Sequence, residues 1–455
     1  MNHLGKAPLI FGLLFLLAFP VIVFRGDDRS DTLEFWIFAQ THYDEFSARI
    51  PAFEAAHPGV KVELRLISKL HDKLLAAFLS GIGGPDLSEV EISSVGRFFK
   101  GTKEEIGFVD LTDRIEREGI TDEFVQARLA PWSLGGRVYG LPRDVHPVML
   151  LYRHDVYQEA GIDPASIETW DDFVRETRPL ARDDDGDGRP DRYPIMLSAH
   201  KPGHFWLLLL QNGGGMFDED GGVIIDNEIA VATLEFYCSL LNEAQLAIPE
   251  FSQDPASYAA MKEGIILGVL APDWYISFVR RFVPELEGKW RAMPLPAWRE
   301  GERRTSTWGG TMIAVTKQAE NPDLAWEFAK FAYMDDEALA NRYRKTFIIP
   351  PIKSAWSNPV YAESETYLDG QVLGRSLTEL APDIPGFHLN PYWAEANDLL
   401  RQAVYEAANG IRTPADALSY LAAQVRALMQ ESTVATDEEG ELRLPSPRIE
   451  STETE

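Results

Sequence analysis

The sequence predicts an α/β protein with open, mixed sheets flanked by helices and a chain divided into two lobes. Two observations carry this prediction. Strand and helix patterns alternate at the start of the chain, and its 455 residues exceed what one hydrophobic core normally holds. With 45% hydrophobic and 25% charged residues, the composition is that of a globular protein. A wholly disordered chain, a collagen-like chain and a small disulfide scaffold are therefore excluded.

The alternation of elements is clearest between residues 33 and 92. Residues 33–38 predict a strand, and residues 46–53 carry apolar side chains at helical spacing. Residues 60–66 alternate between apolar and charged side chains, which is typical of a half-buried strand. A second helix pattern at 74–79 and a strand at 87–92 complete the order of an open parallel sheet.

Later helices are predicted from capping signals. Thr169 and Asp172 are spaced as a capping box, in which each side chain bonds the backbone of the other residue. Asn321 and Thr413 each precede a proline, and proline is favourable at the first position of a helix. We therefore expect helices to begin near residues 170, 322 and 414.

The two ends of the chain differ from its body. Lys6 and the apolar run at residues 9–24 are typical of a secretory signal. The run is just shorter than the roughly 17–25 residues that span a bilayer comfortably. Neither a small-residue cleavage site nor a cysteine for lipid attachment follows it. We expect residues 1–30 to be a signal peptide or an uncleaved membrane anchor, and residues 433–455 to be a disordered acidic tail.

The net charge limits which partners the protein can have, and the cysteine content was examined for signs of its compartment. The chain has 71 acidic and 43 basic residues, and its net charge is −28. Because such a charge repels phosphate backbones, we expect no nucleic acid partner. The lone Cys238 cannot form an internal disulfide, so cysteine content does not reveal the compartment.

Four segments carry a resemblance to a known family. In chain order they are residues 53–62 with 84–86, residues 136–142 with 151–155, 160–164 and 169–173, residues 212–217, and residues 308–315 with 321–328. Through the order and spacing of these segments, the chain resembles the extracellular solute-binding proteins of ATP-driven sugar importers, the maltose-binding-like group.

The resemblance implies both a fold and a function. The fold is the two-lobed periplasmic-binding-protein fold of type II, with a ligand cleft at the hinge. The function is to capture a solute, most simply a sugar, by hinge closure and to deliver it to the membrane permease of an ATP-binding-cassette importer. No bond is made or broken. We expect a monomer in the periplasm or outside the cell, free or tethered by its N-terminal segment.

In such proteins the chain changes lobes more than once. We assign residues 31–141 and 306–338 to lobe 1, and residues 142–305 and 339–432 to lobe 2. One crossing is placed at each of these changes.

Candidate ligand-binding residues come from the resemblance and from strand ends. The aromatic candidates sit near predicted loops, because a sugar ring stacks its C–H face on an aromatic face while its hydroxyls need polar partners. Each polar candidate follows a strand at the expected ligand side of a sheet or adjoins an aromatic one. The candidates are Gln40, Glu91, Arg143, Asp144, Trp206, Asp273, Trp274, Trp308, Gly309 and Gly310.

The sharpest local motif is an acidic loop at residues 183–191. Aspartates stand at relative positions 1, 3, 5 and 9 with glycine at 6, which matches the first part of an EF-hand calcium loop. Pro194 stands where that loop has its bidentate glutamate. We expect one structural Ca²⁺, and its ligands would be Asp183, Asp185, Asp187, the Arg189 carbonyl and Asp191. A solvated acidic turn is the alternative.

Two other functions remain open at this point. A secreted carbohydrate-active hydrolase would need two carboxylates positioned on either side of the bond that it cleaves. With 71 acidic residues in the chain, the sequence does not single out such a pair. A membrane-tethered sensory protein would use the same lobes to report a ligand instead of delivering it. We expect no catalytic residue and no catalytic cofactor.

Overall fold

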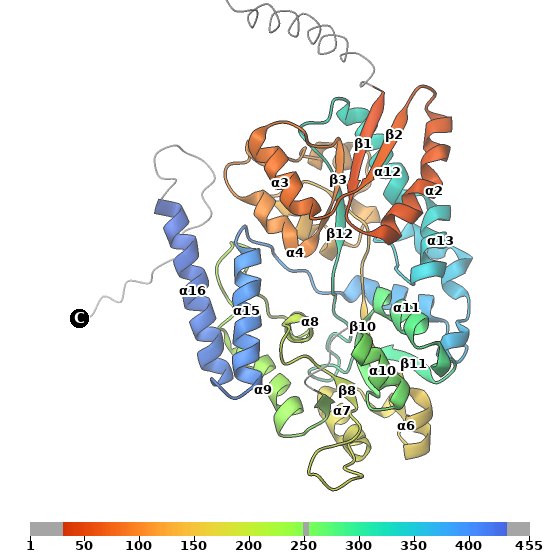
Figure 1. The fold of residues 1–455 in the computed structure, drawn as a ribbon, viewed down its shortest axis with the longest axis vertical. Helices are drawn as coiled ribbons and strands as arrows, with labels where there is room; N and C mark the ends of the chain where they lie inside the picture. Colours follow the sequence, from red (N-terminus) through yellow and green to blue (C-terminus); the bar gives the residue numbers. More distant parts are fainter. Residues whose placement is uncertain (1–30, 249–253, 435–455) are drawn as a thin grey trace, which may run out of the picture. The chain divides into compact units, whose positions relative to one another are not determined.

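The computed structural model describes residues 31–248 and 254–434, so the expected signal or anchor and most of the expected acidic tail lie outside the described residues. The described chain divides into two compact units (Figure 1). Unit 1 comprises residues 31–89, 107–109 and 314–332, and unit 2 comprises the remaining described residues. We describe each unit by itself.

The sheet of unit 1 has the strand order β2-β1-β3-β12. Strand β1 (Thr32–Ile37) pairs in parallel with β2 (Lys61–Leu66) on one side and with β3 (Leu87–Glu91) on the other. Strand β12 (Thr311–Val315) begins in unit 2 and enters unit 1 at Ala314. The helices of this unit are α2 (Gln40–Ala56), α3 (Leu70–Ser80) and α12 (Pro322–Met334), up to Ala332.

Aromatic rings from β1 and from two helices form the core of unit 1. The ring centroid of Phe35 lies 5.3 Å from that of Phe46 and 5.6 Å from that of Phe328. Phe53 lies 5.0 Å from Phe328. Helix α2 therefore buries the residues that its apolar spacing predicted, and its prediction is confirmed.

Unit 2 contains a mixed sheet in the order β11-β7-β10-β8-β9. Strand β7 (Val148–Arg153) is antiparallel to both β10 (Gly268–Pro272) and β11 (Trp290–Pro294). Strand β8 (Ile195–Met196) is parallel to β10 and to β9 (Ala247–Ile248). All six side chains of β7 are buried, as expected of a strand covered on both faces.

The helices of unit 2 cover this sheet and extend beyond it (Figure 1). The longer helices are α6 (His154–Ala160), α7 (Trp170–Thr177), α8 (Gly203–Gln211), α9 (Glu228–Asn242), α10 (Pro255–Glu263), α11 (Asp273–Phe282), α13 (Asp336–Thr346), α14 (Leu373–Leu380), α15 (Trp393–Ala408) and α16 (Pro414–Val434). The predicted capping box at the start of α7 is present, since Thr169 and Asp172 bond each other's backbone N–H groups. Helices α9, α15 and α16 pack against one another.

The boundaries of the two units differ from those predicted for the two lobes. The predicted lobe 1 also includes residues 90–106, 110–141, 306–313 and 333–338, which group with unit 2. At the end of residues 110–141, strand β6 (Leu141–Pro142) pairs with Met312 and Ile313, the part of β12 that also belongs to unit 2. Because lobes are defined by rigid-body movement and these units by contacts, the lobe boundaries stay a prediction.

Between residues 31 and 434, apart from 249–253, no helix is both long and apolar enough to cross a bilayer.

Candidate functional site

A cavity of about 270 Å³ in unit 2 is lined by aromatic rings and a few polar side chains. Four chain segments that are far apart in sequence meet there, around residues 91–93, 201–206, 307–309 and 387–397. Its aromatic residues are Trp206, Trp308, Phe387 and Trp393, and its polar side chains include Glu91, Ser93, Lys201 and Asn397. Apolar walls with a few polar groups are typical of a small-molecule site.

Three of the rings form one cluster on the cavity wall. Trp206 on α8 has its ring centroid 4.8 Å from that of Trp393 at the start of α15 and 5.9 Å from that of Phe387. Phe387 and Trp393 are themselves 6.3 Å apart. These mutual contacts fix the ring planes, so the wall is organised before any ligand arrives.

Trp308 is held by close packing and by a hydrogen bond to its backbone. A Cβ added to Gly203 would lie 2.4 Å from Cζ2 of Trp308, so only glycine lets the indole lie where it does. The ring of His204 packs edge-on against Trp308 at 5.1 Å, and burial lowers the pKa of His204 to about 4, which keeps it neutral. The Trp274 indole N–H donates to the Trp308 carbonyl at 3.1 Å.

Glu91 supplies the carboxylate of the cavity. It ends β3, and its carboxylate accepts hydrogen bonds from the backbone N–H and the hydroxyl of Ser93 at the start of α4 (Ile92–Val95). Burial raises the pKa of Glu91, and the nearby charge of Asp144 adds to the rise, whereas Ser93 opposes it. The carboxyl is half-buried at the cavity wall, where it can accept a hydrogen bond from a ligand hydroxyl.

A buried network of charged groups lies beside this cavity in unit 2. His146 stands between two carboxylates: its Nε2 lies 3.1 Å from Asp144 Oδ2 and its Nδ1 lies 2.6 Å from Asp273 Oδ1. Arg128, whose side chain is fully buried, contacts Asp144 Oδ1 at 3.1 Å. Asp273 also accepts the backbone N–H groups of Trp274 and of residue 349, at 2.7 Å and 3.0 Å.

The network shifts two pKa values in opposite directions. Burial alone would lower the pKa of His146, but the charges of Asp144 and Asp273 outweigh burial and raise it to about 9. Burial alone would raise the pKa of Asp144, but His146, Arg128 and Arg143 hold it well below its usual range. The raised pKa of His146 favours an imidazolium between Asp144 and Asp273, and the Arg128 guanidinium lies beside Asp144.

The sequence-predicted ligand residues fall into three groups. Glu91, Trp206, Trp308 and Gly309 line the cavity. Arg143, Asp144 and Asp273 are buried away from it, and the last two belong to the charged network. Gln40, Trp274 and Gly310 form the third group, of residues that also do not line the cavity.

Each residue of the third group has a local role. Gln40 opens α2 in unit 1, and its amide donates to Asp44 at 2.8 Å on the surface. Trp274 anchors the backbone of Trp308. A Cβ added to Gly310 would lie 2.0 Å from Nη2 of Arg128, so this glycine makes room for the guanidinium.

The cavity is also lined by residues that the sequence did not single out, Ser93, Lys201, Phe387 and Asn397, and by Trp393, which was one of the aromatic candidates near predicted loops. No local motif could have selected the first four, because they gather only through the packing of α8 and α15. Trp393 had one signal, since it is a tryptophan near a predicted loop.

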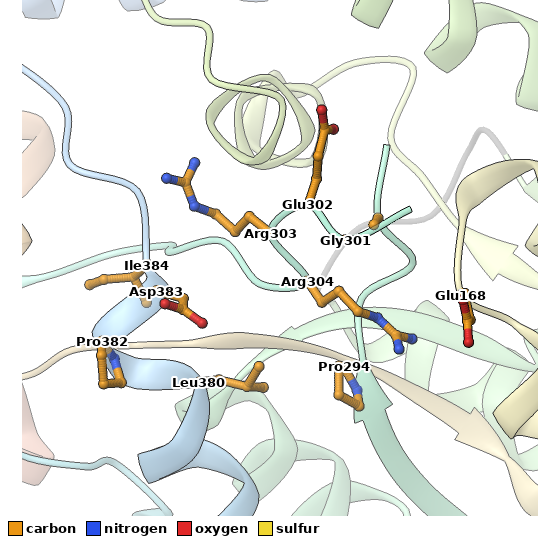
Figure 2. Close-up of a pocket in the computed structure, with 11 residues that line it drawn as sticks. Glu168, Pro294, Gly301, Glu302, Arg303, Arg304, Leu380, Pro382, Asp383 and Ile384 are labelled. Atoms are coloured by element: carbon orange, nitrogen blue, oxygen red, sulfur yellow. The ribbon is translucent and has the colours of Figure 1, made fainter. Parts of the chain in front are cut away.

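A larger cavity of about 750 Å³ lies in another part of unit 2 (Figure 2). None of the described residues that line it is aromatic. Arg304 extends along its wall, where the guanidinium donates to the carbonyls of Leu295 and Ile167 at 3.0 Å and 2.9 Å. Without an aromatic face, this cavity is a poorer sugar site than the smaller one.

The acidic loop has part of the geometry of a cation site. Asp183, Asp185 and Asp187 each offer one carboxylate oxygen, and these atoms all lie within 4.8 Å of one another. The other aspartate of the motif, Asp191, accepts the backbone N–H of residue 184 at 2.7 Å. Three exposed carboxylates this close fit a hard cation such as Ca²⁺, which takes oxygen ligands.

Comparisons with known proteins agree with this architecture. The sequence profile of the family described as bacterial extracellular solute-binding protein matches residues 39–338. The chain therefore belongs to the bacterial extracellular solute-binding proteins, and the predicted family and two-lobed α/β fold are confirmed.

Individual relatives cover nearly the whole chain. The chain is 29% identical to the arabinooligosaccharide-binding protein of Bacillus subtilis over 414 residues, which is 88% of this chain and 93% of that protein. It is 28% identical to the arabinooligosaccharide-binding protein of Halalkalibacterium halodurans over 426 residues, 89% of this chain and 92% of that one. The fold is similar to that of the sugar-binding protein MalE from Xanthomonas citri, with a TM-score of 0.76 and 19% sequence identity. The match covers 90% of this chain and 100% of that one.

Proposed function

We propose that this protein is the extracytoplasmic receptor of an ATP-binding-cassette importer and that it captures an oligosaccharide, with arabinose oligomers as the first candidates. The observation that carries the proposal is the aromatic cavity of unit 2, with Trp308 on its wall and Glu91 beside it. Two relatives that match most of the chain are named for arabinooligosaccharides, which supports the choice of sugar.

The cavity suits a sugar chemically. The faces of Trp206 and Trp308 offer apolar surface for the C–H face of a sugar ring. The carboxylate of Glu91, the amide of Asn397 and the ammonium of Lys201 offer acceptors and donors for its hydroxyls. Binding energy from these contacts would favour one conformation of the protein over another, which is how hinge closure would be driven.

We propose binding without catalysis at this cavity. Among the described residues that line the cavity, Glu91 is the one carboxylate, whereas glycoside hydrolysis normally uses a pair that flanks the scissile bond. The relatives are likewise named as binding proteins. This favours a receptor over the hydrolase, and the sensory alternative has no observation in its favour.

The proposal also covers the partners of the protein and its location in the cell. The protein acts as a monomer in the periplasm or outside the cell, and it delivers its sugar to the membrane permease of the importer. Residues 9–24 tether it to the membrane if they are not cleaved. Mass spectrometry of the native N-terminus tests the tether, because a mature chain that begins near residue 27 would rule it out.

Titration calorimetry with purified protein tests the function. Arabinobiose to arabinohexaose are compared with galactobiose, maltotriose and lactose, and we expect the arabinose series to bind most tightly. Trp308→Ala should abolish most of the affinity, while the matched control Tyr420→Ala, which removes an exposed ring on α16, should not. Release of shorter sugars from a bound oligomer would refute the proposal in favour of a hydrolase.

We further propose that the acidic loop binds one structural Ca²⁺ through Asp183, Asp185 and Asp187, with the Arg189 carbonyl and Asp191 as the remaining candidates. A chelator should lower the melting temperature and added calcium should restore it. Asp185→Ala/Asp187→Ala should abolish that response, while an unrelated acidic pair such as Asp122→Ala/Glu159→Ala should keep it. A chelator response that survives in the loop variant would place the cation elsewhere.

A further inference from the structure

The end of helix α3 and the turn after it present two apolar side chains to solvent. Leu79 is 81% exposed and Ile82 is 76% exposed, which makes them the most exposed large apolar residues in the described part of the chain. No charged residue occurs from Leu74 to Pro85, although 25% of the whole chain is charged. Exposed turns are normally polar, so this uncharged segment marks a surface that meets an apolar partner. We call residues 79–83 the α3 tip.

Hydrogen bonds at both ends hold the α3 tip in a fixed shape. Gln318 Nε2 donates to the carbonyl of Ala77 at 2.8 Å, and Gln318 Oε1 accepts the backbone N–H of Gly84 at 2.8 Å. Within the tip, Gly81 and Gly83 have φ values of 74° and 79°, a region that favours glycine and allows the tight turn. Because one amide joins both ends of the turn, little conformational entropy is left to lose when the tip meets a partner.

The α3 tip lies at the edge of the unit 1 sheet where β1 begins. Strands β1 and β3 are parallel, and Phe35 stands opposite Leu87. Continued back along both strands, this register places Gly84, just after the tip, level with Thr32. The chain therefore enters unit 1 at the edge that carries the tip.

The proposed membrane tether keeps this edge close to the bilayer. Residues 25–31 are all that separates the apolar run at 9–24 from β1, and seven extended residues reach at most about 25 Å. A tip on the same edge is therefore within reach of the membrane surface. Since the tip carries no charge, placing it among lipid headgroups and acyl chains buries apolar side chains without removing a charge from water.

We infer that the α3 tip inserts Leu79 and Ile82 into the surface of the phospholipid bilayer to which the protein is tethered. The inference rests on the tether of the proposed function and adds a second membrane contact, which orients unit 1. Free energy comes from removing the two apolar side chains from water, and it does not depend on anionic lipids. Contact should therefore form on zwitterionic lipid and should persist at high salt.

Fluorescence quenching tests the inference on the full chain reconstituted in phosphatidylcholine vesicles. In a Cys238→Ser background, one new cysteine carries an environment-sensitive dye. At Ile82→Cys, lipids with a quencher on the acyl chain should remove most of the fluorescence, and adding Leu79→Asn should reduce that quenching. The matched control is Leu66→Cys, since Leu66 is 41% exposed in the same unit and lies level with Ile37, about 17 Å along the strands from the edge that carries the tip. The control label should stay unquenched.

The outcomes distinguish the tip from the tether. Protein that fails to float with the vesicles refutes the tether and the inference with it, whereas calorimetry tests sugar binding independently. Floating protein with an unquenched label at residue 82, or with equal quenching at residues 66 and 82, refutes the tip alone. Disulfide-linked dimers that form readily in Ile82→Cys but not in Leu66→Cys would assign the tip to a second copy of the chain. Thermal melting of each variant confirms that it is folded.

Discussion

The pairing of His146 with Asp144 and Asp273 predicts how stability depends on pH. We consider His146→Asn, which removes the positive charge from between the two carboxylates. Asparagine is a suitable replacement because residue 146 has a φ of 57°, and asparagine tolerates this left-handed region better than most residues. The variant therefore changes the charge with little added backbone strain.

The magnitude follows from the pKa of His146. The difference between about 9 in the folded chain and the ordinary 6.5, at 1.36 kcal/mol per pKa unit, corresponds to about 3 kcal/mol of stabilisation. Removing one partner of a buried ion pair costs about 3–5 kcal/mol in general, which agrees. Arg128 remains beside Asp144 in the variant and limits the loss, while Glu91 adds a further acidic group nearby.

The pH dependence has a definite sign. Because the folded pKa of His146 is raised, the unfolded chain gives up this proton at lower pH than the folded chain does. The stabilisation is therefore fully present below about pH 6.5 and is lost as the pH rises through about 9. Urea unfolding of wild type and His146→Asn at pH 6 and at pH 9.5 should show a gap of about 3 kcal/mol that mostly closes at the higher pH. A gap of the same size at both values would refute the imidazolium.

Three further predictions concern close packing around the site. Gly310→Ala places a Cβ 2.0 Å from Arg128 at a φ of 149°, so urea unfolding should show a loss of about 1–3 kcal/mol, and an unchanged stability would contradict the packing. Gly203→Ala should weaken sugar binding by displacing the Trp308 indole while the melting temperature changes little, and undiminished affinity would contradict this. Trp274→Phe keeps a ring but removes the donor to Trp308, so calorimetry should show an affinity loss smaller than that of Trp308→Ala.

Local patterns in the sequence predicted the features that neighbouring residues determine. The apolar spacing of Phe46, Ile50 and Phe53 predicted the buried side of α2, and the Thr169–Asp172 capping box predicted the start of α7. These features depend on contacts within a few residues, which a sequence shows directly. The family could be recognised because its segments keep their order along the chain.

The cavity and the charged network could not be predicted from local sequence patterns. Glu91 and Trp393 line the same cavity although about 300 residues separate them, and only the packing of α15 in unit 2 brings them together. The two partners of His146 lie at positions 144 and 273, and although both were selected as ligand candidates, no pattern in the sequence pairs either of them with His146. Distant pairings of this kind are set by the fold as a whole.

Two of the predicted ligand contacts have bonding partners within the protein. Trp274 and Asp273 were selected as ligand contacts, yet Asp273 bonds His146 and the backbone N–H of Trp274, and Trp274 bonds the carbonyl of Trp308. Hydrogen bonds therefore run from the buried imidazolium through Asp273 and Trp274 to the residue that lines the cavity. Because each bond restricts the next group, the charged network holds the backbone of Trp308 in place, and with it the segment that lines the cavity.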